Sequence, residues 1–175
     1  MATPGPIDYM INAYRERGVG MSVAELLEGY RKGPEQLEAA VAGFSREQFL
    51  ARPIADKWTT LEVLCHVADC EQFIAERIKR ILSFTRPLLL GVDENAYAAA
   101  LRYDRRDAAE ELALVWVTRS QILRILQDQP AEAWERFGIH TESGQMPLKL
   151  AVFHAHFHLH HHLKFVLEKR SALGL

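Results

Sequence analysis

The residues of this sequence with the clearest chemical potential are its histidines, because six of the eight lie between positions 154 and 162. Neutral imidazole is a common ligand for zinc, nickel, iron and copper. Helix residues four apart share a face, so an H-x-x-x-H spacing can present two imidazoles to one ion. The cluster offers three such pairs, 154/158, 156/160 and 158/162. This segment therefore predicts a metal site but does not by itself choose the pair.

The apolar residues of the same segment distinguish between these pairs. At about 100° per residue they form one stripe along the predicted helix. The stripe consists of Leu148, Ala151, Val152, Ala155, Leu159 and Val166. His158 and His162 lie on or beside this stripe, whereas His156 and His160 lie outside it. We therefore expect His158 and His162 to face the interior, and His156 and His160 to be more exposed.

A buried pair of imidazoles needs partners, since an unsatisfied polar group in a core costs about 1–3 kcal/mol. A metal ion would satisfy both rings, but a third ligand is then expected. His66 is the only histidine in another predicted helix, and it lies to one side of that helix's apolar stripe. The alternative interpretation of His66 is an ordinary hydrogen-bonded histidine. With the pair His158 and His162, it completes a candidate set of three metal ligands.

Four further residues could support such ligands. Glu62 and Asp69 lie about one turn to either side of His66, and His154 and His161 flank the late pair. A carboxylate that accepts a hydrogen bond from a ligand imidazole fixes the tautomer of the ring and raises its basicity. An ordinary surface carboxylate is the simpler interpretation of each acid.

Two residues are open to a role in the site. Cys70 lies four residues after His66 and could add a thiolate ligand, although small thiols commonly fill cores. His140 lies in the predicted loop between Gly138 and Gly144 and could contact a substrate. A solvated loop histidine is the simpler interpretation of His140.

Four long helices are predicted to position these residues. Each has a helix-start signal, namely the pair Ser22 and Glu25, the pair Thr59 and Glu62, the pair Asp107 and Glu110, and Pro147. The predicted helices cover about 22–44, 59–84, 107–129 and 147–172. Pro34 predicts a kink or a short break in the first of them. Between the helices we expect at most one helical turn in 45–58, an irregular segment over 87–106 and a loop over 131–146.

Long helices with almost no strand signals indicate an all-α fold, a four-helix bundle. The 175 residues fit one domain over 1–175, with 1–20 as an extension that could hold a short helix at 7–17. A net charge of −2 gives no basic face for nucleic acid. The sequence has no secretory signal, no apolar run of about 18 residues and no C-x-x-C motif. We therefore expect a cytoplasmic protein that does not enter membranes.

Two segments taken together resemble a known family. RPIADKWTTLEVLCHVADCE (52–71) is followed late in the chain by HLHHHLKF (158–165). Both resemble the DinB-like superfamily, a metal-binding family that includes YfiT-type proteins and is unrelated to the DNA polymerase of the same name. The resemblance extends over roughly residues 22–172.

The motifs of that family match at particular residues. The first is a tryptophan after a proline-containing turn, with a histidine eight residues later in a helix, and it is matched by Trp58 and His66. The second is H-x-x-H-H, and it is matched by His158, His161 and His162. Each motif alone is modestly specific, and both in this order are considerably more so.

The resemblance implies a four-helix bundle with up-down-down-up topology that holds one divalent metal ion. Carried over by position, the ligands are His66, His158 and His162. Nickel or zinc is the expected metal, with iron or manganese as alternatives. Relatives often continue the second motif with a polar run such as Arg-Gly-Gln, from which the apolar residues in 163–165 (LKF) depart. Relatives also often form dimers through their helices, so a homodimer is a further expectation.

The resemblance also suggests a reaction. Several relatives transfer low-molecular-weight thiols, so we expect a metal-dependent transferase that adds such a thiol to a small electrophile. The alternatives are a metal-dependent hydrolase and a non-catalytic, stress-related metal or ligand binder. Leu159 follows His158 where a glutamate would be needed for H-E-x-x-H, so the usual zinc-protease base is missing.

Overall fold

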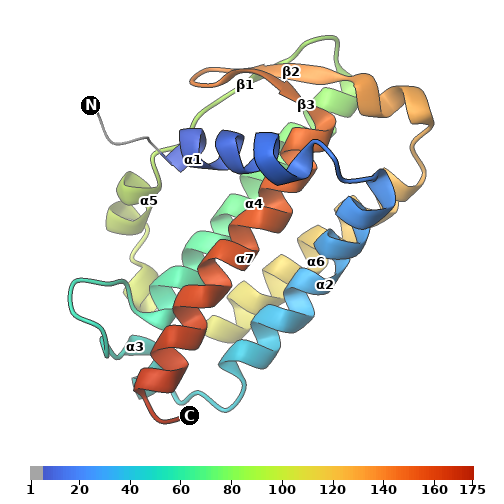
Figure 1. The fold of residues 1–175 in the computed structure, drawn as a ribbon. Helices are drawn as coiled ribbons and strands as arrows, with labels where there is room; N and C mark the ends of the chain where they lie inside the picture. Colours follow the sequence, from blue (N-terminus) through green and yellow to red (C-terminus); the bar gives the residue numbers. More distant parts are fainter. Residues whose placement is uncertain (1–5) are drawn as a thin grey trace.

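Four long helices form the body of the protein in a computed structural model that describes residues 6–175, with side chains from Met10 onward (Figure 1). They are α2 (Val23–Val41), α4 (Thr60–Ser83), α6 (Ala108–Gln127) and α7 (Leu148–Ala172). Helix α2 packs on α7 and α6, and α4 packs on the same two helices. Helices α2 and α7 run in one direction and α4 and α6 in the other. The predicted four-helix bundle with up-down-down-up topology is confirmed.

The predicted helix starts are set by side chains that cap the first turn. The hydroxyls of Ser22 and Thr59 accept hydrogen bonds from the backbone N–H groups of Glu25 and Glu62. In return, the carboxylates of these two glutamates accept hydrogen bonds from the backbone N–H groups of Ser22 and Thr59. The carboxylate of Asp107 accepts from the first backbone N–H groups of α6. Such caps satisfy donors that have no partner inside the helix. In α4 the cap fixes the start of the helix about two turns before His66.

Helix α2 continues through Pro34 without the break that its proline predicts. Proline has no backbone N–H, so the carbonyl of Tyr30, four residues earlier, loses its helical donor. Arg119 Nη1 on α6 donates to that carbonyl at 2.9 Å. A side chain from a neighbouring helix therefore replaces the missing backbone donor, which the sequence of α2 alone cannot reveal.

Arg119 also joins the helices at the centre of the bundle. It is 2% exposed, and its Nη2 donates to Glu71 Oε1 at 2.6 Å and to the carbonyl of Ala155 at 2.5 Å. The apolar core forms two clusters, with Ile74 and Ile122 in one and Leu64 and Val115 in the other. The buried pair of Arg119 and Glu71 lies between these two clusters along both α4 and α6.

Shorter helices flank the bundle. They are α1 (Pro6–Ala13), which continues into a π-helical turn (Tyr14–Gly18), α3 (Arg46–Leu50) and α5 (Glu94–Ala100). Two 3-10 turns cover Tyr103–Arg105 and Ala131–Glu135. The first helix agrees with the prediction over 7–17, whereas α5 was not predicted. None of the helices in the described part of the chain is long and apolar enough to cross a membrane.

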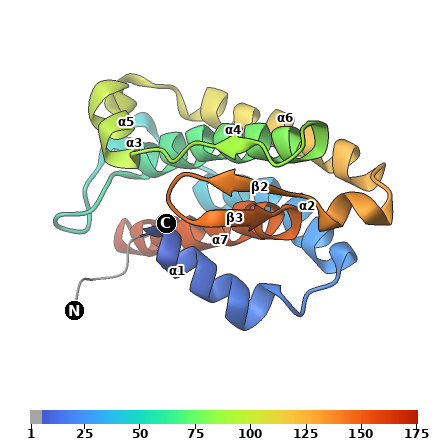
Figure 2. The ribbon, with the colours of Figure 1, turned by 90° about the horizontal axis from the view of Figure 1, so that it is seen from above.

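A small sheet lies across the end of the bundle where α4 ends and α7 begins (Figure 2). It consists of β1 (Leu88–Leu89), β2 (Phe137–His140) and β3 (Gly144–Pro147). Strand β2 pairs with β1 in parallel and with β3 in antiparallel orientation. The expectation of a loop over 131–146 was wrong, because this range contains β2, a turn and β3. Strands this short depend on pairing with distant residues, so they leave almost no periodic pattern in the sequence.

Candidate metal centre

Helices α4 and α7 bring His66, His158 and His162 together. His66 Nε2 lies 3.0 Å from His158 Nε2 and 3.1 Å from His162 Nε2. The rings of His158 and His162, one turn apart on α7, have centroids 4.4 Å apart. Two nitrogens that bind one ion at about 2.0–2.1 Å can lie at most about 4.2 Å apart. Both nitrogen separations are below that limit, so the His66 ring can share an ion with either of the two α7 histidines.

The three rings are also in the protonation state that metal binding requires. Burial lowers the pKa of His66 to about 4 and that of His162 to about 2, and it lowers the pKa of His158 well below its ordinary value. The neighbouring imidazoles lower the pKa of His158 and His162 further. Metals bind the neutral form of histidine. At neutral pH the set is therefore uncharged, and its ring nitrogens, which contact one another in the metal-free protein, can bind an ion instead.

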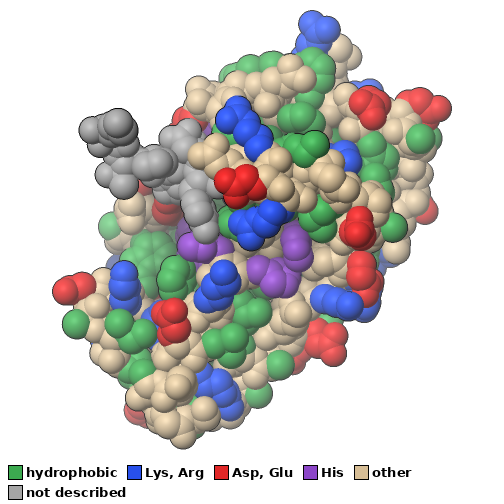
Figure 3. Space-filling view, in the orientation of Figure 1, with side chains coloured by type: hydrophobic (Ala, Val, Ile, Leu, Met, Phe, Trp, Pro, Cys, Tyr) green, Lys and Arg blue, Asp and Glu red, His purple; other side chains and the backbone are tan. Residues whose placement is uncertain are grey.

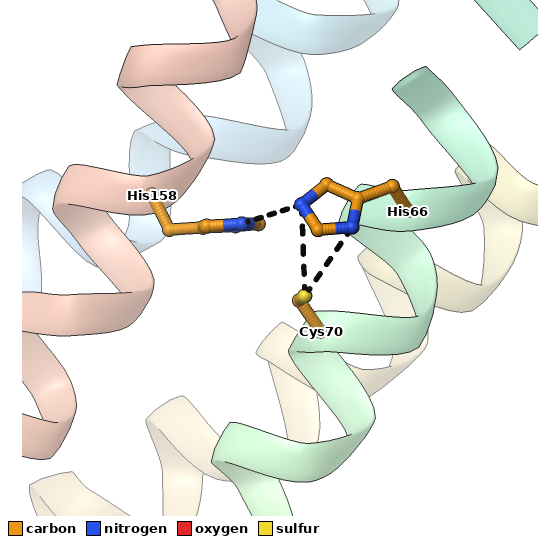
Figure 4. Close-up of side chains that lie close together, drawn as sticks. All are labelled: His66, Cys70 and His158. Atoms are coloured by element: carbon orange, nitrogen blue, oxygen red, sulfur yellow. Dashed lines mark hydrogen bonds between the residues drawn. The ribbon is translucent and has the colours of Figure 1, made fainter. Parts of the chain in front are cut away.

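Cys70 lies beside His66 and near His158 (Figure 4). Its Sγ is 3.8 Å from both ring nitrogens of His66, and the potential ligand atoms of His66, Cys70 and His158 all lie within 4.8 Å of one another. Burial raises the pKa of the Cys70 thiol, so the thiol is protonated in the metal-free protein. The structure therefore places a fourth potential ligand at the site, one that must lose a proton to serve.

The two acids near His66 have other partners. Glu62 Oε1 accepts from Arg52 Nη2 at 2.8 Å, and Oε2 accepts from the backbone N–H of Thr59. Asp69 Oδ2 accepts from the hydroxyl of Tyr103 at 2.7 Å. Asp69 also pairs with a guanidinium, that of Arg106, at 2.9 Å. Both carboxylates are thereby occupied in holding connecting segments against α4.

Trp58 positions the ring of His66. Its ring meets that of His66 edge to face, with centroids 5.2 Å apart. Edge-to-face pairs of this kind favour one relative orientation of the two rings. Trp58 thereby restricts the rotation of the His66 ring, in addition to its expected place at the start of α4.

The remaining histidines of α7 fall into two groups. His154 and His161 lie beside the triad formed by His66, His158 and His162. Their ring centroids lie 5.8 Å from that of His158 and 5.2 Å from that of His162, respectively. His156 and His160 form a separate pair on another face, with centroids 4.3 Å apart. All six histidines of α7 are partly buried. His156 and His160 therefore belong to the same exposure class as His158 and His162, and the greater exposure expected for them is not seen. His156 packs against Gly29 of α2.

His140 is not the solvated loop residue that the sequence suggested. It ends strand β2 and is 2% exposed. Its Nδ1 accepts from the backbone N–H groups of Glu142 and Ser143 at 3.3 and 3.4 Å. Its Nε2 is buried and has no hydrogen-bond partner among the described residues. The turn residues TESG (141–144) were the available signal for a hairpin, but burial of the histidine depends on packing against α4.

The triad forms part of the wall of a cavity of about 800 Å³. Aromatic rings, those of Trp58, Phe73, Tyr97 and Phe157, form much of the rest. Arg77, His140 and His154 also line the cavity, and no sequence pattern singles out Arg77. Histidine side chains gather on the face of the molecule below α1 (Figure 3). The size and the mixed lining are typical of a site for a small organic ligand.

Known proteins share both the sequence pattern and the fold. Residues 30–166 match the DinB superfamily. A protein of Geobacillus thermodenitrificans described as a "Putative metal-dependent hydrolase" is 33% identical over 101 residues, which are 56% of this chain and 56% of that protein. The chain therefore matches only about half the length of that relative. YfiT from Bacillus subtilis, described as a probable metal-dependent hydrolase with an unusual four-helix bundle topology, superposes with a TM-score of 0.81 at 21% identity, over 89% of this chain and 91% of that one. Since the superfamily match spans most of the chain, the protein belongs to the DinB superfamily.

Proposed function

We propose that this protein binds one divalent metal ion through His66, His158 and His162 and uses it to add a low-molecular-weight thiol to a small electrophile. The observation that carries the proposal is the convergence of three neutral Nε2 atoms at the wall of a cavity large enough for both substrates. Nickel and zinc suit a site of imidazole nitrogens, and iron and manganese are the alternatives.

Three protein ligands leave at least one position open, as in catalytic rather than structural zinc sites. An ion held there would lower the pKa of a bound thiol or water and so supply a nucleophile at neutral pH. Trp58 and the other aromatic residues of the cavity wall would contact the apolar part of the electrophile. Each histidine keeps its place because helix packing, not a flexible loop, sets its position.

The two acids nearest His66 in the chain favour a thiol over water as the nucleophile. Hydrolysis benefits from a general base that accepts the proton of the attacking water. Glu62 and Asp69 are the acids nearest His66 in the chain, and other partners occupy both carboxylates. A free thiol has a pKa of about 8.5, so it needs less help to ionise than water does. Thiol transfer is therefore the reaction that demands least of these residues.

Metal-dependent hydrolysis is the second candidate. The descriptions of the Geobacillus thermodenitrificans relative and of Bacillus subtilis YfiT both name this activity. The same ion and the same cavity would serve it, with an ester or amide in place of the electrophile. The two candidates differ in whether a thiol is consumed.

The metal assignment is tested by elemental analysis of the purified protein after removal of any tag. We expect about one ion per chain in the wild type and in His156→Ala, and almost none in His162→Ala. His156 is the matched control because it lies on the same helix and pairs with a different histidine. Equal metal content in both variants would refute the ligand set.

The reaction is tested with the metal-loaded protein and 1-chloro-2,4-dinitrobenzene, with cysteine or a cysteine-containing bacterial thiol as the second substrate. Conjugation forms a carbon–sulfur bond and releases chloride and the thiol proton, which the absorbance of the product reports. We expect turnover that depends on both metal and thiol and is absent in His162→Ala. Turnover of p-nitrophenyl acetate without a thiol would instead support the hydrolase. No turnover in either assay, with more than one ion bound per chain, would support a non-catalytic metal binder.

A further inference from the structure

The cavity contains a buried cation that the proposed metal chemistry does not use. Arg77 on α4 is 7% exposed, and its Nη2 donates to the carbonyl of Leu90 at 2.6 Å. The negative charges of Glu142 and Glu76 act on Arg77, but neither carboxylate, nor any other among the described side chains, forms a salt bridge with it within 4.0 Å. A guanidinium keeps its charge in proteins, and a buried charge is unfavourable unless an anion pairs with it. Since Arg77 has no directly paired carboxylate within the described chain, its guanidinium can still bind a negative group from outside the chain.

His140 adds a hydrogen-bond donor at the same place. Because its Nδ1 accepts two backbone N–H bonds, the proton of the neutral ring resides on Nε2. That Nε2 is buried and has no partner among the described residues, although His140 lines the cavity. Buried polar groups in proteins are nearly always hydrogen-bonded, so a donor of this kind calls for an acceptor. Strand β2, which carries His140, packs directly on α4, which carries Arg77.

Helix geometry places this pair at the opposite end of the cavity from the triad. Arg77 follows His66 by 11 residues, about three turns, so the two share a face of α4 and lie about 16 Å apart along its axis. His154 precedes His158 by one turn of α7, and its ring lies 5.8 Å from that of His158. The positive charge of Arg77 acts on His154, as does the neighbouring His140. His154 thus connects the triad to the Arg77 end, and its buried Nδ1 also has no partner among the described residues.

We propose that Arg77 and His140, with His154 beside them, bind a carboxylate of the substrate whose reacting group lies at the His66–His158–His162 triad. This inference rests on the proposed function for the reacting end but on separate residues for the carboxylate. It identifies the substrate class as small organic acids with the carboxylate several bonds from the reacting atom. A guanidinium matches the two oxygens of a carboxylate, and the Nε2–H of His140 supplies a further donor.

Acidic residues in the same cavity favour a carboxylate over a phosphate. Asp93, Glu94 and Glu142 also line it, and the Asp93 carboxylate caps α5 through the backbone N–H groups of Asn95 and Ala96. Their negative charges offset part of the attraction of the single guanidinium. A phosphate monoester with up to two negative charges would be repelled more strongly than a carboxylate with one. One arginine and neutral imidazoles therefore suit a monoanion.

The first test uses mercaptocarboxylates of two to five methylenes and mercaptoalcohols of equal length as probes. Isothermal titration of the zinc-loaded protein measures the affinity of each probe. At the length that spans the cavity, we expect the carboxylate to bind at least about 10-fold more tightly than the alcohol, a typical effect of a charge-assisted hydrogen bond. Arg77→Gln should remove this difference and leave the affinity for the alcohol unchanged. Arg80→Gln is the matched control, because Arg80 is exposed on the same helix and should keep the difference.

The second test does not depend on metal. Histidine ring ¹⁵N NMR of the metal-free protein should show His140 protonated at Nε2, and butyrate should shift this signal whereas 1-butanol should not. Arg77→Gln should abolish the response, and Arg77→Lys, which keeps the charge, should retain part of it. If thiols fail to bind the zinc-loaded protein but butyrate still shifts His140, the proposed function fails and the carboxylate site stands. Equal affinities of acid and alcohol at every length, or a His140 signal indifferent to butyrate, would overturn the carboxylate site.

Discussion

At the residue scale, Cys70 adds a thiol to the three histidines of the candidate site. The thiol lies 3.8 Å from the His66 ring nitrogens, close enough to serve as a fourth ligand. Four protein ligands would close a tetrahedral site and make it structural, whereas three leave it open for substrate. Burial raises the pKa of the Cys70 thiol, which opposes its use as a thiolate. The neutral imidazoles face no such cost, so we assign the binding to them.

Replacing Cys70 separates these two possibilities. We expect Cys70→Ala to retain about one ion per chain and to keep its affinity within about 10-fold of the wild type. Loss of a ligand histidine should exceed the 10- to 100-fold that loss of a supporting residue costs. Competition with a chromophoric chelator measures both, with His162→Ala in parallel. A loss in Cys70→Ala as large as that in His162→Ala would make Cys70 an obligatory ligand and the site a closed one.

At the element scale, Arg119 allows a proline-containing helix to pack in the bundle. Its guanidinium bonds to the Tyr30 carbonyl that Pro34 leaves free, to Glu71 on α4 and to the Ala155 carbonyl on α7. The ion pair with Glu71 is almost fully buried. Removing one member of such a pair leaves a buried charge uncompensated, and here it would also leave two carbonyls with fewer donors.

Substitution of Arg119 should therefore be strongly destabilising. We expect Arg119→Met to lower the free energy of unfolding by about 3–5 kcal/mol, as measured by urea denaturation followed by circular dichroism. The double variant Arg119→Met, Glu71→Leu should recover part of this loss because it removes the stranded carboxylate. Arg124→Met, on the exposed side of the same helix, should change stability by about 0.5 kcal/mol or less. An effect of Arg119→Met no larger than that of Arg124→Met would show that the buried pair contributes little.

The long helices were predictable because their signals are local. Capping residues such as Ser22 and Thr59 act within one turn, and an apolar stripe repeats along a single helix. The same stripe located His158 and His162 on α7, and the family motif supplied His66. Distances within a helix follow from spacing alone, so these residues could be chosen before the fold was known.

The rest of the site depends on contacts between segments far apart in the chain. His140 lies on β2, which packs against α4, and Arg77 donates to the carbonyl of Leu90, which follows β1. The partners of Asp69 are Tyr103, 34 residues later, and Arg106. Short strands and buried arginines carry no periodic signal, so the sequence could not place them. Of the residues of the proposed carboxylate site, the sequence pointed to His140 and His154 as candidates, and only Arg77 was not foreseen.

At the scale of the whole molecule, metal binding should stabilise the fold. The triad joins α4 to α7, so the ion binds the folded chain and has little affinity for the unfolded one. At a free metal concentration 100 times the dissociation constant, the free energy of unfolding should rise by about 2.7 kcal/mol. Thermal denaturation with and without zinc measures this effect. His162→Ala should show almost no response to zinc, and an equal response in both proteins would place the stabilising site elsewhere.

The metal-free protein should lose stability as the pH falls below about 6.5, the ordinary pKa of histidine. Burial lowers the pKa of His66 to about 4 and that of His162 to about 2, so the unfolded chain binds protons that the folded chain does not. A group with a lowered pKa in the folded state contributes its full stability above the unfolded pKa and loses it as the pH falls towards the folded pKa. At pH 5 this amounts to about 2 kcal/mol for each such histidine.

Urea denaturation between pH 7.5 and pH 5 isolates this effect, because ordinary carboxylates titrate mainly below that range. The slope of stability against pH should be positive and should correspond to the uptake of several protons on unfolding. His66→Gln should reduce this slope by about one proton, whereas removal of a carboxylate, as in Glu28→Gln on the surface of α2, should leave it unchanged. A stability that stays flat down to pH 5 would mean that the folded protein protonates these rings. The triad would then not be the neutral, metal-ready set on which the proposed function depends.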